Sequence, residues 1–252
     1  MTDPQTPAQT VDPEEQAFLA AYDPGVFPRP SVATDVVVLT VREGRLVVAL
    51  YQRAEHPHRG RWALPGGFVR MDEALSTAAR RLLRDKVGVQ GVFLEQLYTF
   101  GDPGRDPRMR IITVAYLALV PPARLQVEKG ALAAVEVDWA GEAGGPARAI
   151  GPDGAALPIA FDHADILGLA VQRLRGKLRY SPVAYAMLPP RFTLRALQSV
   201  HEAILGEALS KPAFRRRLLA TGELRATGEL ESDVDHRPAE LYEHAPQEED
   251  AS

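Results

Sequence analysis

The segment from residue 62 to residue 89 constrains the fold of this chain more than any other stretch. It begins at Trp62, passes through the turn Pro65-Gly66-Gly67, and continues into residues 73–87, where apolar side chains recur at helical spacing. Residues 33–50 precede it and form a predicted β-hairpin, with two apolar runs on either side of a tight turn. A strand, a glycine turn and a helix are therefore predicted to meet at residues 65–67, where glycine allows close approach of another group.

More strands and a second helix follow this segment. Residues 93–100 and 110–120 have the composition of strands, and two weaker strands are predicted near residues 135–139 and 147–150. Asp162 is placed to cap a helix that runs to about Lys177. This alternation of strands with two helices predicts an α+β fold in which one sheet is sandwiched between helices.

The spacing of Gly67, Glu73, Arg81 and Gly88-Val89 resembles that of a known family. It follows the pattern G-x5-E-x7-R-E-U-x-E-E-x-G-U, where U is a bulky apolar residue, and on this basis residues 30–178 resemble a Nudix domain. The resemblance implies an α/β/α sandwich with a mixed sheet. It also implies a site in which glutamates of the R-E-U-x-E-E segment hold Mg²⁺, a cation that prefers oxygen ligands, for pyrophosphate cleavage.

Two of those glutamates are replaced in this chain, by Leu82 and Lys86. Positions i and i+4 share one face of a helix, so an apolar side chain and an ammonium group occupy the positions of two metal ligands. Glu73 and Asp85 remain as residual carboxylates and weak metal candidates. We therefore expect no catalytic residue and no required cofactor, with Mg²⁺ needed only if the chain is a hydrolase. Lys86 is expected either to neutralise a bound diphosphate or to point into solvent.

The expected nucleotide site draws on the glycine turn, the first helix and a later loop. The two glycines either allow a phosphate to approach the backbone or serve only as a strand-to-helix turn. Arginines in the Gly/Pro-rich loop at residues 101–108 suit phosphate recognition, although surface arginines are commonly just solvated. The predicted ligand-binding residues are Trp62, Gly66, Gly67, Phe68, Lys86, Arg105 and Arg108. Trp62 is expected to serve the core first, and His163 to be structural or to contact ligand.

Residues 173–217 form a basic block in a chain whose net charge is −4. Ten Lys and Arg residues stand there against two glutamates, which is typical of a small nucleic-acid-binding module. A helix over residues 194–205 capped by Thr193, a second helix from Ser210, and strand-like pieces beyond residue 222 fit a winged helix-turn-helix domain. A solvated basic face or a dimerisation domain is the alternative. The predicted DNA-binding residues are Arg195, Lys211, Arg215, Arg216 and Arg217.

Four short segments resemble a narrower family. They are residues 96–108, Phe161-Asp162-His163, Arg191-Phe192-Thr193-Leu194, and Arg237-Pro238 ahead of Leu241-Tyr242. Together they resemble the Nudix-related transcriptional regulators of NAD metabolism, the NrtR family, over residues 30–244. The resemblance implies a homodimeric repressor that binds double-stranded operator DNA and senses ADP-ribose or a related nucleotide. Coupling of the two sites would pass through residues 179–190, with the helix at 162–177 as the connecting element.

The domain organisation follows from these segments. Residues 1–28 are expected to form a flexible, mostly disordered arm, 29–178 the nucleotide-sensing domain, 179–245 the winged helix, and 246–252 a disordered acidic tail. The absence of cysteine excludes disulfides and thiolate metal sites. No signal peptide and no apolar run of the ~20 residues that span a membrane are found, so a cytoplasmic protein without a membrane partner is expected. The alternative functions are an ADP-ribose pyrophosphatase-type hydrolase and a nucleotide-binding protein without DNA activity.

Overall fold

The computed structural model describes residues 12–127, 130–232 and 237–245, in two compact units that comprise residues 1–30 and 31–252. In the first unit, α1 (Pro13–Ala21) begins at Asp12, whose side chain accepts a hydrogen bond from the Glu14 backbone N–H at 3.0 Å. The expectation of a mostly disordered arm is therefore wrong for this stretch, since an N-cap and an early proline were both present. The predictions for residues 1–11 and for the tail at 246–252 fall outside the described residues.

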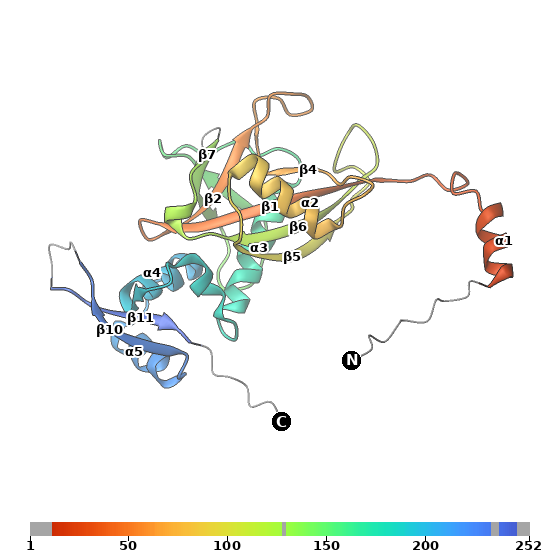
Figure 1. Cartoon of the computed structure of the whole chain (residues 1–252). Coiled ribbons are helices and arrows are strands. Elements are labelled where there is room, and N and C mark those ends of the chain that lie inside the picture. Colours follow the sequence, from red (N-terminus) through yellow and green to blue (C-terminus); the bar gives the residue numbers. More distant parts are fainter. Residues whose placement is uncertain (1–11, 128–129, 233–236, 246–252) are drawn as a thin grey trace, which may run out of the picture. The chain divides into compact units, whose positions relative to one another are not determined.

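A mixed sheet forms the centre of the second unit (Figure 1). Its main strands run in the order β5-β6-β1-β2-β7-β8, with β3 paired to β2 and β4 paired to β1. β1 and β6 are parallel, while the other pairs are antiparallel. The strands are β1 (Ser31–Arg42), β2 (Arg45–Gln52), β3 (Trp62–Ala63), β4 (Gly66–Phe68), β5 (Phe93–Phe100), β6 (Ile111–Leu119), β7 (Ala131–Val137) and β8 (Ala147–Ile150).

Helices cover both faces of this sheet, because β1 is apolar on both sides. Val36 and Val38 pack in one cluster with α2 (Leu75–Leu82), whereas Val37 and Leu39 pack in another with α3 (His163–Lys177). The predicted α/β/α sandwich with a mixed sheet is confirmed. One local feature differs from the sequence analysis: the predicted helix over residues 73–87 is α-helical only to Leu82 and continues as a π-helical turn, η1 (Leu83–Val87).

The C-terminal part of the chain is a winged helix. A 3-10 segment η3 (Pro182–Met187) leads into β9 (Phe192–Thr193), α4 (Leu194–Leu205) and α5 (Lys211–Ala220), and β10 (Leu224–Leu230) and β11 (Glu240–His244) form the wing with β9. The predicted cap of α4 is confirmed, since the Thr193 hydroxyl accepts from the Ala196 N–H at 3.1 Å. α5 packs inward through Phe214 and Leu218, which are both buried.

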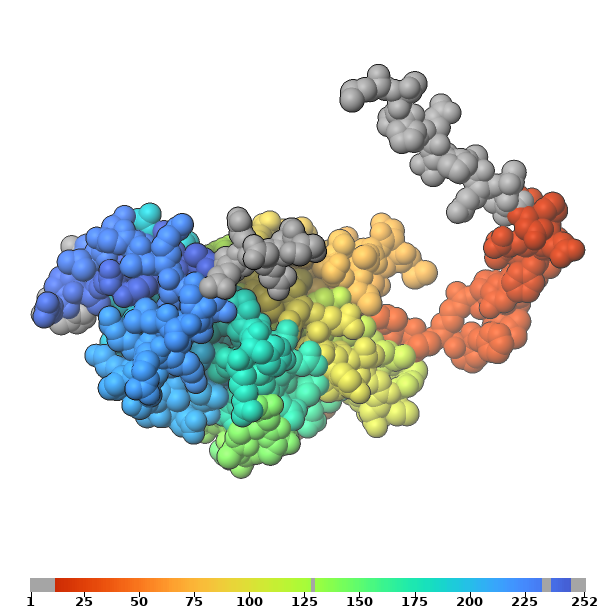
Figure 2. All heavy atoms as spheres, turned by 90° about the horizontal axis from the view of Figure 1, so that it is seen from below, coloured from red at the N-terminus to blue at the C-terminus, as the bar shows by residue number. Residues whose placement is uncertain are grey.

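One apolar core joins the sheet to the winged helix. The cluster on the α3 face of the sheet continues without interruption through Met187 and Phe192 into α4 and α5, where it includes Leu197, Ile204 and Phe214. In Figure 2 the blue winged-helix atoms accordingly lie directly against the teal atoms of the α3 region. The described residues contain no helix that is long and apolar enough to cross a membrane.

Candidate functional site

The glycine turn lies in direct contact with a buried carboxylate of β1. A Cβ atom on Gly66 would stand 2.0 Å from Oδ1 of Asp35, and one on Gly67 would stand 3.0 Å from the Leu82 side chain. Only glycine fits at Gly66, because a side chain there would overlap an atom in a packed interior. Leu82 itself is buried, so the first replaced glutamate position has become part of the core.

The two residual carboxylates are each engaged by an arginine. Glu73 accepts hydrogen bonds from the Arg81 guanidinium at 2.5 and 2.9 Å and from the Arg70 N–H, and the bonds from Arg81 above all lower its pKa to about 2. Asp85 pairs with Arg84 at 2.8 Å on the surface. Within the described part of the chain, no group of three or more His, Asp or Glu side chains is placed to hold a metal. These donors do not fit Mg²⁺, which requires converging oxygen ligands.

Lys86 occupies the position from which the second glutamate is missing. Its ammonium donates to the Gly66 carbonyl at 2.5 Å and to the Tyr51 hydroxyl at 3.0 Å, and it lies 4.5 Å from the centre of the Tyr51 ring. No carboxylate of the described chain lies within ion-pairing distance of this ammonium. Lys86 is an exposed residue, but its ammonium is held beside the glycine turn instead of extending into solvent, and its contact with a diphosphate stays a prediction.

The glycine turn and Lys86 line a cavity of ≈ 210 Å³ at the end of the sheet. This volume is smaller than the ~300–1,000 Å³ typical of a complete small-molecule pocket, so it suits one polar part of a larger ligand, such as a diphosphate. Six of the seven predicted ligand-binding residues line it. The lining residues are Ala33, Asp35, Tyr51, Arg53, Glu55, Gly66, Gly67, Phe68, Lys86, Arg105, Asp106, Arg108, Ile111, Phe161 and His163.

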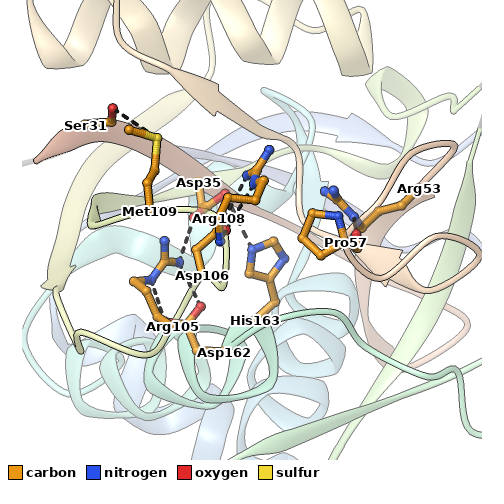
Figure 3. A network of polar contacts seen from close by, with 10 residues as sticks. All are labelled: Ser31, Asp35, Arg53, Pro57, Arg105, Asp106, Arg108, Met109, Asp162 and His163. Carbon is orange, nitrogen blue, oxygen red and sulfur yellow. Dashed lines mark hydrogen bonds and ion pairs between the residues drawn. The ribbon is translucent and has the colours of Figure 1, made fainter.

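The wall of the cavity contains a buried network of charges (Figure 3). The Arg105 guanidinium donates to both carboxylate oxygens of Asp162, at 2.7 and 2.8 Å, and lies 3.5 Å from Asp35. Its side chain is only 5% exposed. Of the two alternatives for Arg105, a solvated surface arginine is therefore wrong, because two carboxylates engage its forked donors. Arg105 also lines the cavity, and its contact with a ligand stays a prediction.

Asp162 and His163 begin α3 within this network. Asp162 makes no side-chain cap bond to the helix, contrary to the predicted cap, because its carboxylate faces Arg105. His163 accepts from the Leu64 N–H through Nδ1 at 3.0 Å, and its Nε2 lies 3.6 Å from Asp35. Burial lowers the pKa of His163, so the ring is neutral, which agrees with an acceptor at Nδ1. Asp35 was missed by the sequence analysis, although a carboxylate inside an apolar strand was a usable signal.

Two arginines and two aromatic rings surround the mouth of the cavity. Arg108 pairs with Asp106 at 2.7 Å and keeps 45% of its side chain exposed, with its guanidinium 5.9 Å from the Phe68 ring. Arg53, which the sequence analysis did not identify, lies 4.7 Å from the Phe161 ring and donates to the Pro57 carbonyl. These groups offer cations and apolar faces to a ligand.

Trp62 does not line this cavity, so the structure gives its predicted ligand contact no support. It pairs with Gln52 in the short β3–β2 ladder, and its backbone N–H donates to the Pro158 carbonyl at 2.8 Å. Its side chain packs against the apolar core on the α3 face of the sheet. The core role that the sequence analysis gave Trp62 first is the one the structure shows.

The winged helix presents an uneven distribution of charge. All five predicted DNA-binding residues are exposed; Arg215, Arg216 and Arg217 lie between the buried positions Phe214 and Leu218, and Lys211 begins α5. Two other arginines of this domain, Arg191 just before β9 and Arg225 in β10, are both paired with Glu243. The available positive charge of this domain is therefore concentrated on α5, with Arg195 at the start of α4.

Comparison with known proteins agrees with both halves of the structure. Residues 29–143 match the NUDIX domain, and residues 184–244 match the NrtR DNA-binding winged helix domain. The ADPR responsive transcriptional repressor NtrR of Acinetobacter baylyi is 37% identical over 238 residues, which cover 94% of this chain and 90% of that protein.

Two solved structures extend the comparison. Shewanella oneidensis NrtR complexed with a 27mer DNA is 34% identical, with a TM-score of 0.70 over 84% of this chain and 93% of that chain. The NUDIX domain of the same Shewanella protein, complexed with ADP ribose, is 33% identical, with a TM-score of 0.50 over 64% of this chain and 98% of that chain. The chain therefore belongs to the NrtR family of transcriptional regulators, in which a Nudix domain is joined to a DNA-binding winged helix.

Proposed function

We propose that this protein is a transcriptional repressor of NAD metabolism genes whose affinity for operator DNA changes when ADP-ribose or a related nucleotide occupies the Nudix domain. One observation carries this proposal. In the same chain, the Nudix box has exchanged two metal-binding acids for Leu82 and a cavity-facing Lys86, while α5 presents exposed cations on a winged helix. We infer from these two features that the chain binds a diphosphate and DNA and does not cleave the nucleotide.

The relatives support both ligands. The Acinetobacter protein is named as responsive to ADP-ribose, and the Shewanella structures hold DNA in one case and ADP ribose in the other. In the present chain, the ligand's diphosphate would lie against Lys86 and the glycine turn, with the rings of Phe68 and Phe161 at the cavity mouth. The cation next to the phosphate removes the need for a metal bridge.

A Nudix hydrolase is the competing function, and it requires Mg²⁺. Because Glu73 is bound to Arg81 and Asp85 to Arg84, neither carboxylate is directed at the cavity. We therefore propose that no cofactor is required. Incubation of the full chain with ADP-ribose and Mg²⁺, followed by chromatography for AMP and ribose 5-phosphate, tests this directly. Turnover within the ~1–1,000 s⁻¹ range of ordinary enzymes would contradict a sensor.

The DNA partner also favours a dimer. A winged helix places one helix in the major groove, and two such helices related by a two-fold axis read the halves of a palindromic operator. We propose a homodimer that acts in the cytoplasm. Sedimentation of the protein alone and on DNA measures the stoichiometry, and one chain per operator would contradict the dimer.

A further inference from the structure

Arg175 connects the two domains through its side chain. It lies near the end of α3, it is 7% exposed, and its Nε donates to the carbonyl of Ile204 in α4 at 2.9 Å. Its Nη1 donates to Gly141 at 3.0 Å and to Trp139 at 3.4 Å, both in the loop that follows β7. One guanidinium thus joins a Nudix helix, a Nudix loop and the end of the first helix of the winged domain.

The hydrogen-bond acceptors of Arg175 are all carbonyl oxygens, and its guanidinium also lies 4.9 Å from the centre of the Trp139 ring. Among the described residues no carboxylate pairs with it, although burying a guanidinium without an anion is costly. The carbonyl of Ile204 belongs to the last turn of α4, where carbonyls lack helical partners and a cation is favourable. A hydrogen bond of this kind needs a donor–acceptor distance of about 2.7–3.2 Å, so a displacement well under 1 Å is enough to break it. A buried donor that loses its acceptor is unfavourable. A displacement of α4 that loses this bond therefore leaves a buried guanidinium partly unsatisfied.

The other end of α3 lies in the wall of the nucleotide cavity. Asp162 and His163 begin the helix there, and at a rise of ~1.5 Å per residue His163 and Arg175 are about 18 Å apart along one rigid element. The helix is held tightly against its own loop, since a Cβ on Gly168 would meet the Gly145 carbonyl oxygen at 1.8 Å. A ligand that contacts Arg105 or His163 thus acts on the start of α3, and α3 and the loop move together.

The winged domain continues this connection to the DNA-facing helix. Gly206 ends α4, and a Cβ there would lie 3.2 Å from the Arg175 guanidinium. The carboxylate of Glu202, also in the last turns of α4, accepts from the Leu209 N–H at 2.8 Å, which fixes the turn just ahead of α5. A shift of the α4 end relative to Arg175 is therefore carried to the start of α5.

We propose that Arg175 is the positioning residue through which nucleotide occupancy reaches the DNA-binding domain. Its contact with Ile204 holds the end of α4 in one of two arrangements relative to α3, and the ligand selects between them by acting on the α3 start. This inference rests on the proposed function, because it assumes that both ligands bind. Arg175 lies neither in the nucleotide cavity nor on α5. Replacing it should therefore reduce the coupling between the two sites while both sites remain.

The test compares Arg175→Met with Arg173→Met in the full chain. Arg173 also lies on α3 and donates to a carbonyl, but its partner is Leu97 of β5 within the Nudix domain, at 3.1 Å. The measured quantity is the ratio of DNA dissociation constants with and without saturating ADP-ribose, by fluorescence anisotropy. Thermal unfolding and calorimetric ADP-ribose affinity are recorded for each protein. Arg175→Lys, which keeps the charge but loses the fork, replaces the methionine variant if that variant does not fold.

We expect a ratio of at least about fivefold in the wild type and in Arg173→Met, as is usual for allosteric coupling. In Arg175→Met the ratio should fall below about twofold while ADP-ribose affinity stays within about threefold of wild type, and Arg175→Lys should lie in between. An unchanged ratio in folded Arg175→Met, or an equal loss in Arg173→Met, overturns the role of Arg175. A wild-type ratio of one would instead contradict the proposed function itself.

Discussion

The basic surface of α5 gives a quantitative prediction about DNA binding. Arg215 and Arg216 are exposed, and neither is ion-paired with a described carboxylate. Each phosphate neutralised by such a side chain adds ~0.9 to the slope of log affinity against log salt concentration, because bound counterions are released. Replacing both with Ala should therefore reduce the slope by about 1.8, provided that each contacts one phosphate.

The same slope sets the loss expected on raising the salt. A fourfold rise in salt concentration, from 50 to 200 mM, weakens DNA binding by about 3.5-fold for each phosphate contact. The double variant should therefore lose about 12-fold less affinity than the wild type over this range. Fluorescence anisotropy with labelled operator DNA at several salt concentrations measures this. Arg191→Ala is the matched control. Arg191 is paired with Glu229 and Glu243, so its replacement should leave the salt slope unchanged. Equal slopes for the double variant and the wild type would show that α5 does not contact the phosphates.

Four further predictions concern the nucleotide site and the stability of the winged helix. ADP-ribose binding measured by calorimetry should persist in a metal chelator, because Lys86 is held beside the glycine turn, and complete loss would reveal a metal site. Gly66→Ala should abolish that binding and lower the melting temperature, since its Cβ would overlap Asp35, and unchanged affinity would place the ligand elsewhere. Phe214→Ala should lower stability by about 3–5 kcal/mol in urea unfolding and remove DNA binding. His201 packs against Phe214, and burial lowers its pKa to about 4. Between about pH 4 and pH 6.5, His201 is therefore protonated in the unfolded chain but neutral in the folded one. Stability should fall as the pH drops from about 6.5 towards 4, and His201→Leu should flatten this dependence.

The elements with strong local signals were predictable from the sequence. The hairpin of β1 and β2, the capped helix α4 and the inward residues Phe214 and Leu218 all follow from periodicity or capping, which depend on neighbouring residues. The replacement of two glutamates by Leu82 and Lys86 was also visible, because the spacing of the box is fixed along the sequence. Such features require no knowledge of how distant segments pack.

The remaining features depend on contacts between distant segments. Asp35, Arg105 and Asp162 are widely separated in the chain, and only the sheet brings their charges together. A sequence cannot show that an arginine in a polar loop will find two carboxylates. Arg175 was counted in the basic block, yet the structure buries it against α4. Charge counting identifies a basic segment, but it does not separate cations available to DNA from those that hold domains together.

The proposed function requires that one protein binds both ligands and that each alters the affinity for the other. A titration of labelled DNA from upstream of the protein's own gene tests this, with and without saturating ADP-ribose, at constant salt and with a chelator present. We expect specific binding without nucleotide, and a change in the DNA dissociation constant of at least about fivefold when ADP-ribose is added. The same DNA dissociation constant in both conditions, for a protein that calorimetry shows to be saturated with ADP-ribose, would contradict the proposed function.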